Sequence, residues 1–75
     1  MSSGAKYTII LEKTDDGYSA YVPDLPGCIA AGDTYDETVQ LMREAIEFHL
    51  EGMRLNGEAM PEPTSVAETV EVGAP

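Results

Sequence analysis

The segment between Thr34 and Gly57 constrains the fold of this chain more than any other part of the sequence. Thr34 and Glu37 have the spacing of an N-terminal capping box, in which each side chain can bond a free backbone N–H group. Asp36 and Glu37 add negative charge to the first turn, where the helix dipole favours it. Asn56 and Gly57 are typical of a helix end. The sequence therefore predicts one long helix that begins after Thr34 and ends at about Asn56.

Apolar residues cover more of this helix than one face of a sheet can bury. When successive residues are placed about 100° apart, two stripes, each about 80° wide, give an apolar arc of about 220°. The first stripe is expected to face a sheet and comprises Val39, Met42, Ile46, Leu50 and Met53. The second stripe comprises Leu41, Ala45, Phe48, Gly52 and Leu55. The remaining arc is polar and includes Glu44, Glu47 and Glu51.

The second stripe has two interpretations. Loops and a C-terminal strand of the same chain can cover it, or a second chain can pack against it about a two-fold axis. A chain of 75 residues favours the second interpretation, because so small a core barely offsets the entropy lost on folding. Its one cysteine, Cys28, cannot form an internal disulfide that would add stability. We therefore expect an oligomer interface formed by Leu41, Ala45, Phe48 and Leu55.

Two short runs before the helix predict an antiparallel hairpin. Residues 7–13 read YTIILEK, which is rich in β-branched and aromatic residues and too short for a favoured helix. Residues 18–22 read YSAYV and alternate, so that positions 18, 20 and 22 share one face of a strand. The turn between the two runs ends in Gly17, where a positive φ is available to close a tight hairpin.

The connector between the hairpin and the helix is expected to be partly rigid. Residues 23–27 read PDLPG, and the two prolines fix φ while Gly27 permits a tight bend. Residues 28–32 read CIAAG and predict a third short strand. Because its side chains are small, the helix can approach the sheet closely at this strand.

The region after the helix completes a single expected domain. Residues 58–63 are acidic, contain two prolines and predict a loop, and residues 65–72 carry alternating valines that predict a final edge strand. The order is therefore β-β-β-α-β, an α+β fold with an antiparallel sheet and one helix packed on one face. We expect one domain over residues 6–72, with flexible termini at residues 1–5 and 73–75.

The charge of the chain excludes several classes of partner. Four Lys and Arg residues face 14 Asp and Glu residues, which gives a net charge of −10 at pH 7. Phosphate binding needs clustered cations, so direct binding to nucleic acid or to an anionic membrane is not expected. No apolar run approaches the roughly 20 residues of a transmembrane helix, and the first residues lack the apolar core of a signal peptide. A cytoplasmic protein is therefore expected.

The sequence indicates no catalytic, cofactor-binding or metal-binding residues. His49 is the single histidine and has no metal-ligand spacing around it, so an interior or interface position is expected. Cys28 has no neighbouring cation to stabilise a thiolate and is expected to be a small buried apolar residue. The many carboxylates fall in turns, caps and exposed helix positions, whereas a two-metal nuclease needs several that converge.

The order of these features resembles the N-terminal domain of the HicB antitoxin family. The resemblance is carried by YVPDLPGC at residues 21–28, the strand that ends in Gly32, TYDE at residues 34–37 and the Glu44-Ala45 pair. It covers roughly residues 6–72, and Thr38 stands where the family usually has Ala. The resemblance implies a partial RNase H-like fold in which the helix packs across the antiparallel sheet.

The resemblance also implies a function. A HicB-like antitoxin binds a small basic HicA-type toxin, occludes its RNA-cleaving site and assembles as a dimer or tetramer. An acidic surface would steer such a toxin toward the chain, although the same acidity would also keep a small oligomer soluble. The expected toxin contacts are Asp24 and Leu25 in the connector and Glu44, Glu47 and Glu51 on the helix.

Two other functions stay open at the level of the sequence. A degenerate RNase H-like nuclease would need a divalent ion at clustered carboxylates, and a stand-alone oligomeric domain would bind an unidentified ligand. Many HicB antitoxins also carry a C-terminal helix-turn-helix or ribbon-helix-helix domain that binds DNA. This sequence ends at Pro75 without such a segment, so DNA binding is not part of the expectation. Short HicB-like chains also need not have a cognate toxin.

Overall fold

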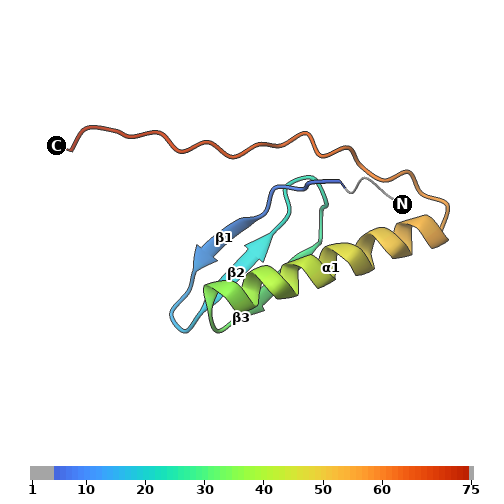
Figure 1. Cartoon of the computed structure of the whole chain (residues 1–75), viewed down its shortest axis with the longest axis horizontal. Helices are drawn as coiled ribbons and strands as arrows, with labels where there is room; N and C mark the ends of the chain where they lie inside the picture. The colour runs from blue at the N-terminus through green and yellow to red at the C-terminus, as the bar shows by residue number, and fades with distance from the viewer. Residues whose placement is uncertain (1–4, 75) are drawn as a thin grey trace.

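A computed structural model of the chain describes residues 5–74, and within this range three short strands and one long helix form (Figure 1). The elements are β1 (Ile10–Lys13), β2 (Tyr18–Tyr21), β3 (Ile29–Gly32) and α1 (Tyr35–Leu55). The strands pair antiparallel in the order β1-β2-β3, and α1 packs across β2 and β3. The predicted α+β class, with an antiparallel sheet and one packed helix, is confirmed.

The hairpin forms where the alternating pattern predicted it. Ile10 pairs with Tyr21 and Lys13 pairs with Tyr18, so β1 is shorter than the predicted run over residues 7–13. Gly17 has no positive φ, and that part of the prediction is wrong. Gly17 is needed for a different reason, because a β-carbon there would collide with the backbone carbonyl oxygen of Gly32 at the end of β3.

The connector over residues 23–27 is held by backbone hydrogen bonds. The Leu25 N–H donates to the carbonyl oxygen of Val22 at 3.1 Å, and the Cys28 N–H donates to that of Leu25 at 3.1 Å. Gly27 has a φ of 85°, a left-handed conformation that glycine adopts without steric cost. The predicted tight bend is therefore confirmed, and it turns the chain from β2 into β3.

Both ends of α1 follow the predicted signals. The Glu37 N–H donates to Thr34 Oγ1 at 3.1 Å, so Thr34 caps the helix. The Glu37 carboxylate accepts from the Asp33 N–H at 2.9 Å, one residue earlier than an ideal capping box requires. At the other end Asn56 is the C-cap, and Gly57 has a φ of 72°. The helix boundaries expected from the sequence are confirmed.

The rotation of α1 about its axis differs from the prediction. Thr38 and Met42 are fully buried, and Ala45 of the second stripe packs against the core. Of the stripe expected to face the sheet, Ile46 and Leu50 also pack against the core, whereas Val39 is only half-buried. The closest approach is between α1 and the end of β3, because glycine at position 32 leaves room for Thr38. This contact turns the helix so that both apolar stripes are only partly covered.

The core lies between α1 and the β2–β3 half of the sheet. It is built from small and medium side chains: Ala20, Val22, Leu25, Cys28 and Met42. Alternate residues of β2 therefore face the helix as predicted, and Tyr21 between them is exposed. Cys28 is 4% exposed, which confirms its predicted place as a small buried apolar residue.

The predicted edge strand over residues 65–72 is wrong for the described chain. This segment is extended but pairs with no strand within residues 5–74, and residues 66–74 are all exposed. Figure 1 shows it continuing past the β1 side of the sheet, which accounts for the longest dimension of 51 Å against 26 and 23 Å for the other two. Of the termini expected to be flexible, residues 1–4 and 75 lie outside the described range.

The last hydrogen bonds that hold the C-terminal segment to the domain are made at Ser65. The Asp24 carboxylate accepts from the Ser65 N–H at 2.9 Å and from Ser65 Oγ at 2.8 Å. Thr8 Oγ1 donates to the carbonyl oxygen of Ser65 at 2.7 Å. These three bonds fix the direction of the chain at Ser65. A strand needs a neighbouring backbone as well as alternation, and the anchor at Ser65 leads the segment away from the free edge of β1.

Candidate protein-binding surface on the helix

The side of α1 turned away from the sheet carries large exposed apolar side chains. Phe48 is 83% exposed and Leu55 is 69% exposed. Both belong to the second apolar stripe, of which Leu41 is half-buried and Ala45 packs against the core. The stripe is therefore divided: Ala45 packs against the core, whereas Phe48 and Leu55 are exposed. Large apolar side chains exposed together on one side of a helix make this side a candidate contact surface.

Acidic side chains flank Phe48 on both sides along the helix. Glu44 lies four residues before Phe48 and Glu51 lies three residues after it, so both are its neighbours on the helix surface. We call Glu44, Phe48, Glu51 and Leu55 the helix face. The sequence assigned the glutamates and the apolar residues to two different partners, although their helical spacing makes them neighbours, and in the structure both kinds are exposed on one surface. The arrangement suits a partner with both apolar and basic groups.

The glutamates of the helix face are held by neighbouring polar side chains. Gln40 Nε2 donates to Glu44 Oε2 at 3.2 Å. Arg54 bonds both carboxylate oxygens of Glu51, at 3.1 Å from Nε and 2.6 Å from Nη2. These bonds lower the pKa of Glu51 below its ordinary value and raise that of Arg54. Both glutamates are exposed, but Glu51 is paired with Arg54 whereas Glu44 is bonded by a neutral amide, so Glu44 offers the stronger negative charge to an approaching partner.

The two connector residues expected to contact a toxin serve the fold in this structure. Leu25 is completely buried in the core. The Asp24 carboxylate accepts hydrogen bonds from Thr64 and Ser65. These bonds lower the pKa of Asp24, and those from the Ser65 backbone and hydroxyl have the largest effect. Of the five predicted toxin contacts, Glu44, Glu47 and Glu51 therefore lie on the surface with their side chains exposed.

The described residues hold no cluster that would favour metal chemistry. Within residues 5–74, no group of three or more His, Cys, Asp or Glu side chains is placed to bind an ion. Burial raises the pKa of the Cys28 thiol above its ordinary value, so the thiol is protonated at neutral pH. His49 is half-buried on α1. In the same range, α1 is not apolar enough along its length to cross a membrane.

Sequence reasoning missed a second surface. Lys6 and Arg43, two of the four cations of the chain, border a groove between the N-terminal segment and α1. The sequence placed Arg43 beside the first apolar stripe and Lys6 directly before the first predicted strand, which is a weak sign that both border the sheet-facing side of the helix. Because they are 37 positions apart, the sequence did not predict that they border the same groove, which forms only when the helix packs on the sheet.

Comparison with known proteins identifies the family of the chain. A family model of the HicB_like antitoxin of bacterial toxin-antitoxin system matches residues 7–73. The 14.9 kDa protein of the rep-hol intergenic region of Haemophilus phage HP1 is 44% identical over 64 residues, or 85% of this chain and 48% of the phage protein. Antitoxin HicB 2 of Photorhabdus laumondii subsp. laumondii is 30% identical over an alignment of 81 residues, gaps included, which covers 93% of this chain and 58% of that protein.

A solved structure gives the same result for the fold. A chain of the HicA3 and HicB3 toxin-antitoxin complex matches with a TM-score of 0.69 at 33% identity, covering 80% of this chain and 70% of that chain. The fold and the helix face define a small α+β domain with a surface suited to protein contact. The chain belongs to the HicB-like antitoxin family of bacterial toxin-antitoxin systems. It spans about half the length of the phage relative.

Proposed function

We propose that this chain is an antitoxin that binds a basic, HicA-type toxin through the helix face and occludes the RNA-cleaving site of the toxin. The observation that carries the proposal is the exposed Phe48 between Glu44 and Glu51. Aromatic residues are enriched in protein interfaces, where a polar rim surrounds the buried contacts. The match to a chain of a solved HicA3 and HicB3 complex supports a toxin as the partner.

The charge of the chain supports the same proposal. A net charge of −10 attracts a toxin rich in Lys and Arg and speeds its association at low salt. RNA is also an anion, so an acidic antitoxin competes with it for the same cations of the toxin. In this proposal the chain acts in the cytoplasm by occlusion and performs no catalysis itself.

The helix face was also expected to join two copies of this chain. That interface, formed by Leu41, Ala45, Phe48 and Leu55, stays a prediction and competes with toxin binding for Phe48 and Leu55. We favour the toxin because Glu44 and Glu51 lie beside Phe48 on the same surface, where they would attract a basic partner. About a two-fold axis, the face of one copy would meet the same acidic face of the other, and like charges repel.

Two matched substitutions test the proposal. Phe48 and Ile29 are both exposed apolar residues, 83% and 69% exposed, but Ile29 lies on β3 outside the helix face. The probe is a purified HicA-type toxin, and affinity is measured by calorimetry. We expect Phe48→Ala to weaken binding by roughly thirtyfold and Ile29→Ala by less than about threefold. Equal effects of both substitutions would place the toxin elsewhere.

A charge variant separates specific glutamate contacts from general attraction. Glu44→Gln/Glu51→Gln removes two charges from the helix face, and Glu12→Gln/Glu58→Gln removes two exposed charges elsewhere. We expect the first pair to weaken toxin binding by roughly tenfold and the second pair only through a slower association rate. If both pairs behave alike, the glutamates act only through net charge, and the helix face is not the site.

A further inference from the structure

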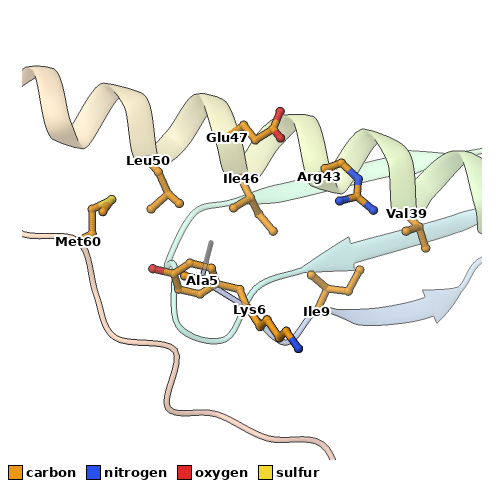
Figure 2. Close-up of a pocket in the computed structure, with 10 residues that line it drawn as sticks. Ala5, Lys6, Ile9, Val39, Arg43, Ile46, Glu47, Leu50 and Met60 are labelled. Atoms are coloured by element: carbon orange, nitrogen blue, oxygen red, sulfur yellow. The ribbon is translucent and has the colours of Figure 1, made fainter. Parts of the chain in front are cut away.

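A groove on the β1 side of α1 is too apolar to be an ordinary solvent-facing surface. It has a volume of about 830 Å³ and is bordered by the chain over residues 5–9, by α1 and by Met60. Figure 2 shows Val39, Ile46 and Leu50 extending from α1 toward it, with Ile9 on the opposite side. The groove exists because α1 packs chiefly on β2 and β3 and leaves β1 uncovered.

The edge of the sheet beside this groove is free to pair. In the described chain β1 bonds only β2, so the outer backbone groups of Ile10–Lys13 have no strand beside them. A strand added at this edge would continue the sheet beneath α1 and cover Val39 and Ile46. Lys6, Arg43 and Glu47 border the same groove, so it has an excess of one positive charge and suits a strand of apolar residues that carries a carboxylate.

The C-terminal arm, residues 66–72, has this composition. Val66, Val70 and Val72 fall on one side of the extended chain together with Glu68, and they are exposed to between 73% and 86%. Three exposed valines in seven residues carry no benefit to an isolated domain. The arm therefore has the alternation, the β-branched residues and the negative charge that the groove requires.

The geometry at Ser65 keeps the arm out of the groove of its own chain. Tyr7 and Ile9 pack against the core, so the extended chain turns Thr8, between them, toward the opposite side. Thr8 holds Ser65, so the arm departs from the side that faces away from the groove.

The residues just before Ser65 also keep the arm extended. Pro61 and Pro63 stiffen this stretch, because their fixed φ angles oppose a reversal of the chain. Tyr7 also donates from its hydroxyl to the Pro61 carbonyl oxygen at 2.5 Å, which ties the stretch down.

We infer that two copies of this chain exchange their C-terminal arms, with residues 66–72 of each copy adding a strand to β1 of the other and filling its groove. The valines cover Ile9, Val39 and Ile46 of the second copy, and Glu68 lies near Lys6 or Arg43. Exchange is two-fold symmetric and closed, so it produces a dimer. The helix face stays exposed in this dimer, so the inference is independent of the proposed toxin binding.

The test compares two doubly substituted full-length chains by light scattering over a range of concentrations. Val66→Glu/Val70→Glu places charges on the side of the arm that enters the groove, and Ala67→Glu/Thr69→Glu places the same charges on the other side. We expect a dimer for the original chain. The valine variant should raise the dimer dissociation constant by roughly a hundredfold, and the control by less than about fivefold. Circular dichroism checks that both remain helical.

A groove variant tests the other half of the contact. Arg43 is exposed, so Arg43→Glu leaves the core intact, and we expect it to weaken the dimer by about fivefold. The inference is overturned if the original chain is monomeric at about 0.1 mM, a concentration well above a micromolar dissociation constant, because the arm then folds back or stays free. It is also overturned if the two arm variants weaken the dimer equally, or if Phe48→Glu dissociates the dimer and the valine variant does not.

Discussion

A β-carbon placed on Gly32 would lie 2.8 Å from Thr38 Oγ1 and 3.2 Å from the Thr38 backbone nitrogen. This contact between the end of β3 and the first turn of α1 sets how the helix lies on the sheet. Thr38 also donates from Oγ1 to the Thr34 carbonyl oxygen at 2.7 Å, so its hydroxyl is satisfied although the residue is fully buried. With the helix rotated in this way, the groove forms on one side of α1 and Phe48 is exposed on the other.

Two glycine substitutions should change stability in opposite directions. Gly32→Ala forces Thr38 and the helix backbone to shift, and we expect it to lower the free energy of unfolding by about 1–3 kcal/mol. Gly52→Ala adds a methyl group within α1 where no atom lies within 4 Å. It should raise the free energy of unfolding by about 0.5–1 kcal/mol, because alanine favours the helix. Urea denaturation measures both, and a neutral Gly32→Ala would show that the contact does not constrain the helix.

Loss of the N-cap should destabilise the helix by a predictable amount. Thr34→Ala removes the acceptor for the Glu37 N–H and should lower the free energy of unfolding by about 1 kcal/mol. Thr34→Ser keeps the hydroxyl and should be within about 0.5 kcal/mol of the original chain. Thermal or urea denaturation compares the three proteins. If serine costs as much as alanine, the cap acts through packing and not through its hydrogen bond.

The contribution of Asp24 should disappear in acid. Bonds from Ser65 hold the pKa of Asp24 below the ordinary value of 3.8, so ionised Asp24 is favoured in the folded chain. A lowered folded-state pKa stabilises the fold above the unfolded pKa, and this contribution is lost as the pH falls through the lowered value. Asp24→Ala should therefore be less stable than the original chain at about pH 6 and equally stable at about pH 2.

Amide exchange gives a local check of the same anchor. In Asp24→Ala the Ser65 amide loses its acceptor and should exchange faster with deuterium, whereas the Thr38 amide, bonded to Thr34 within the helix, should keep its rate. Asp15→Ala, in the exposed hairpin turn, serves as the control. A Ser65 amide that exchanges at the same rate in both proteins would show that Asp24 does not hold the segment in solution.

The Cys28 thiol should react slowly in the folded protein. It is 4% exposed, and burial raises its pKa, so both access and the thiolate fraction are low at neutral pH. We expect iodoacetamide to modify Cys28 only as fast as the domain opens, with the rate rising as urea is added. Rapid modification of the folded chain without urea would contradict the buried position.

Local parts of the fold could be predicted from the sequence because their signals are local. Thr34 and Glu37 marked the start of α1, Gly57 marked its end, and the alternation around Ala20 identified β2. The chemistry of each signal lies within a few residues of the structure it produces. The helix boundaries and the hairpin are therefore the most successful predictions.

Features that depend on distant residues could not be predicted in the same way. The rotation of α1 depends on Gly32 and Thr38 meeting, and the path of the C-terminal segment depends on Asp24 bonding Ser65 across 41 positions. The valines after Ser65 alternate in the sequence, but alternation does not identify a strand that pairs with them, and none forms in the described chain. The helical spacing of Phe48 and Glu51 already placed them side by side, whereas the 83% exposure of Phe48 depends on how the helix packs on the sheet.

The most direct test of the proposed function is inhibition of RNA cleavage by a purified HicA-type toxin. Cleavage of a fluorescent RNA is followed as the purified chain is added. We expect cleavage to stop near one chain per toxin, and Phe48→Ala to require roughly tenfold more protein than Ile29→Ala. Toxin occlusion by the helix face would be contradicted if cleavage continued in the presence of excess chain. It would also be contradicted if Phe48→Ala and Ile29→Ala inhibited cleavage equally well.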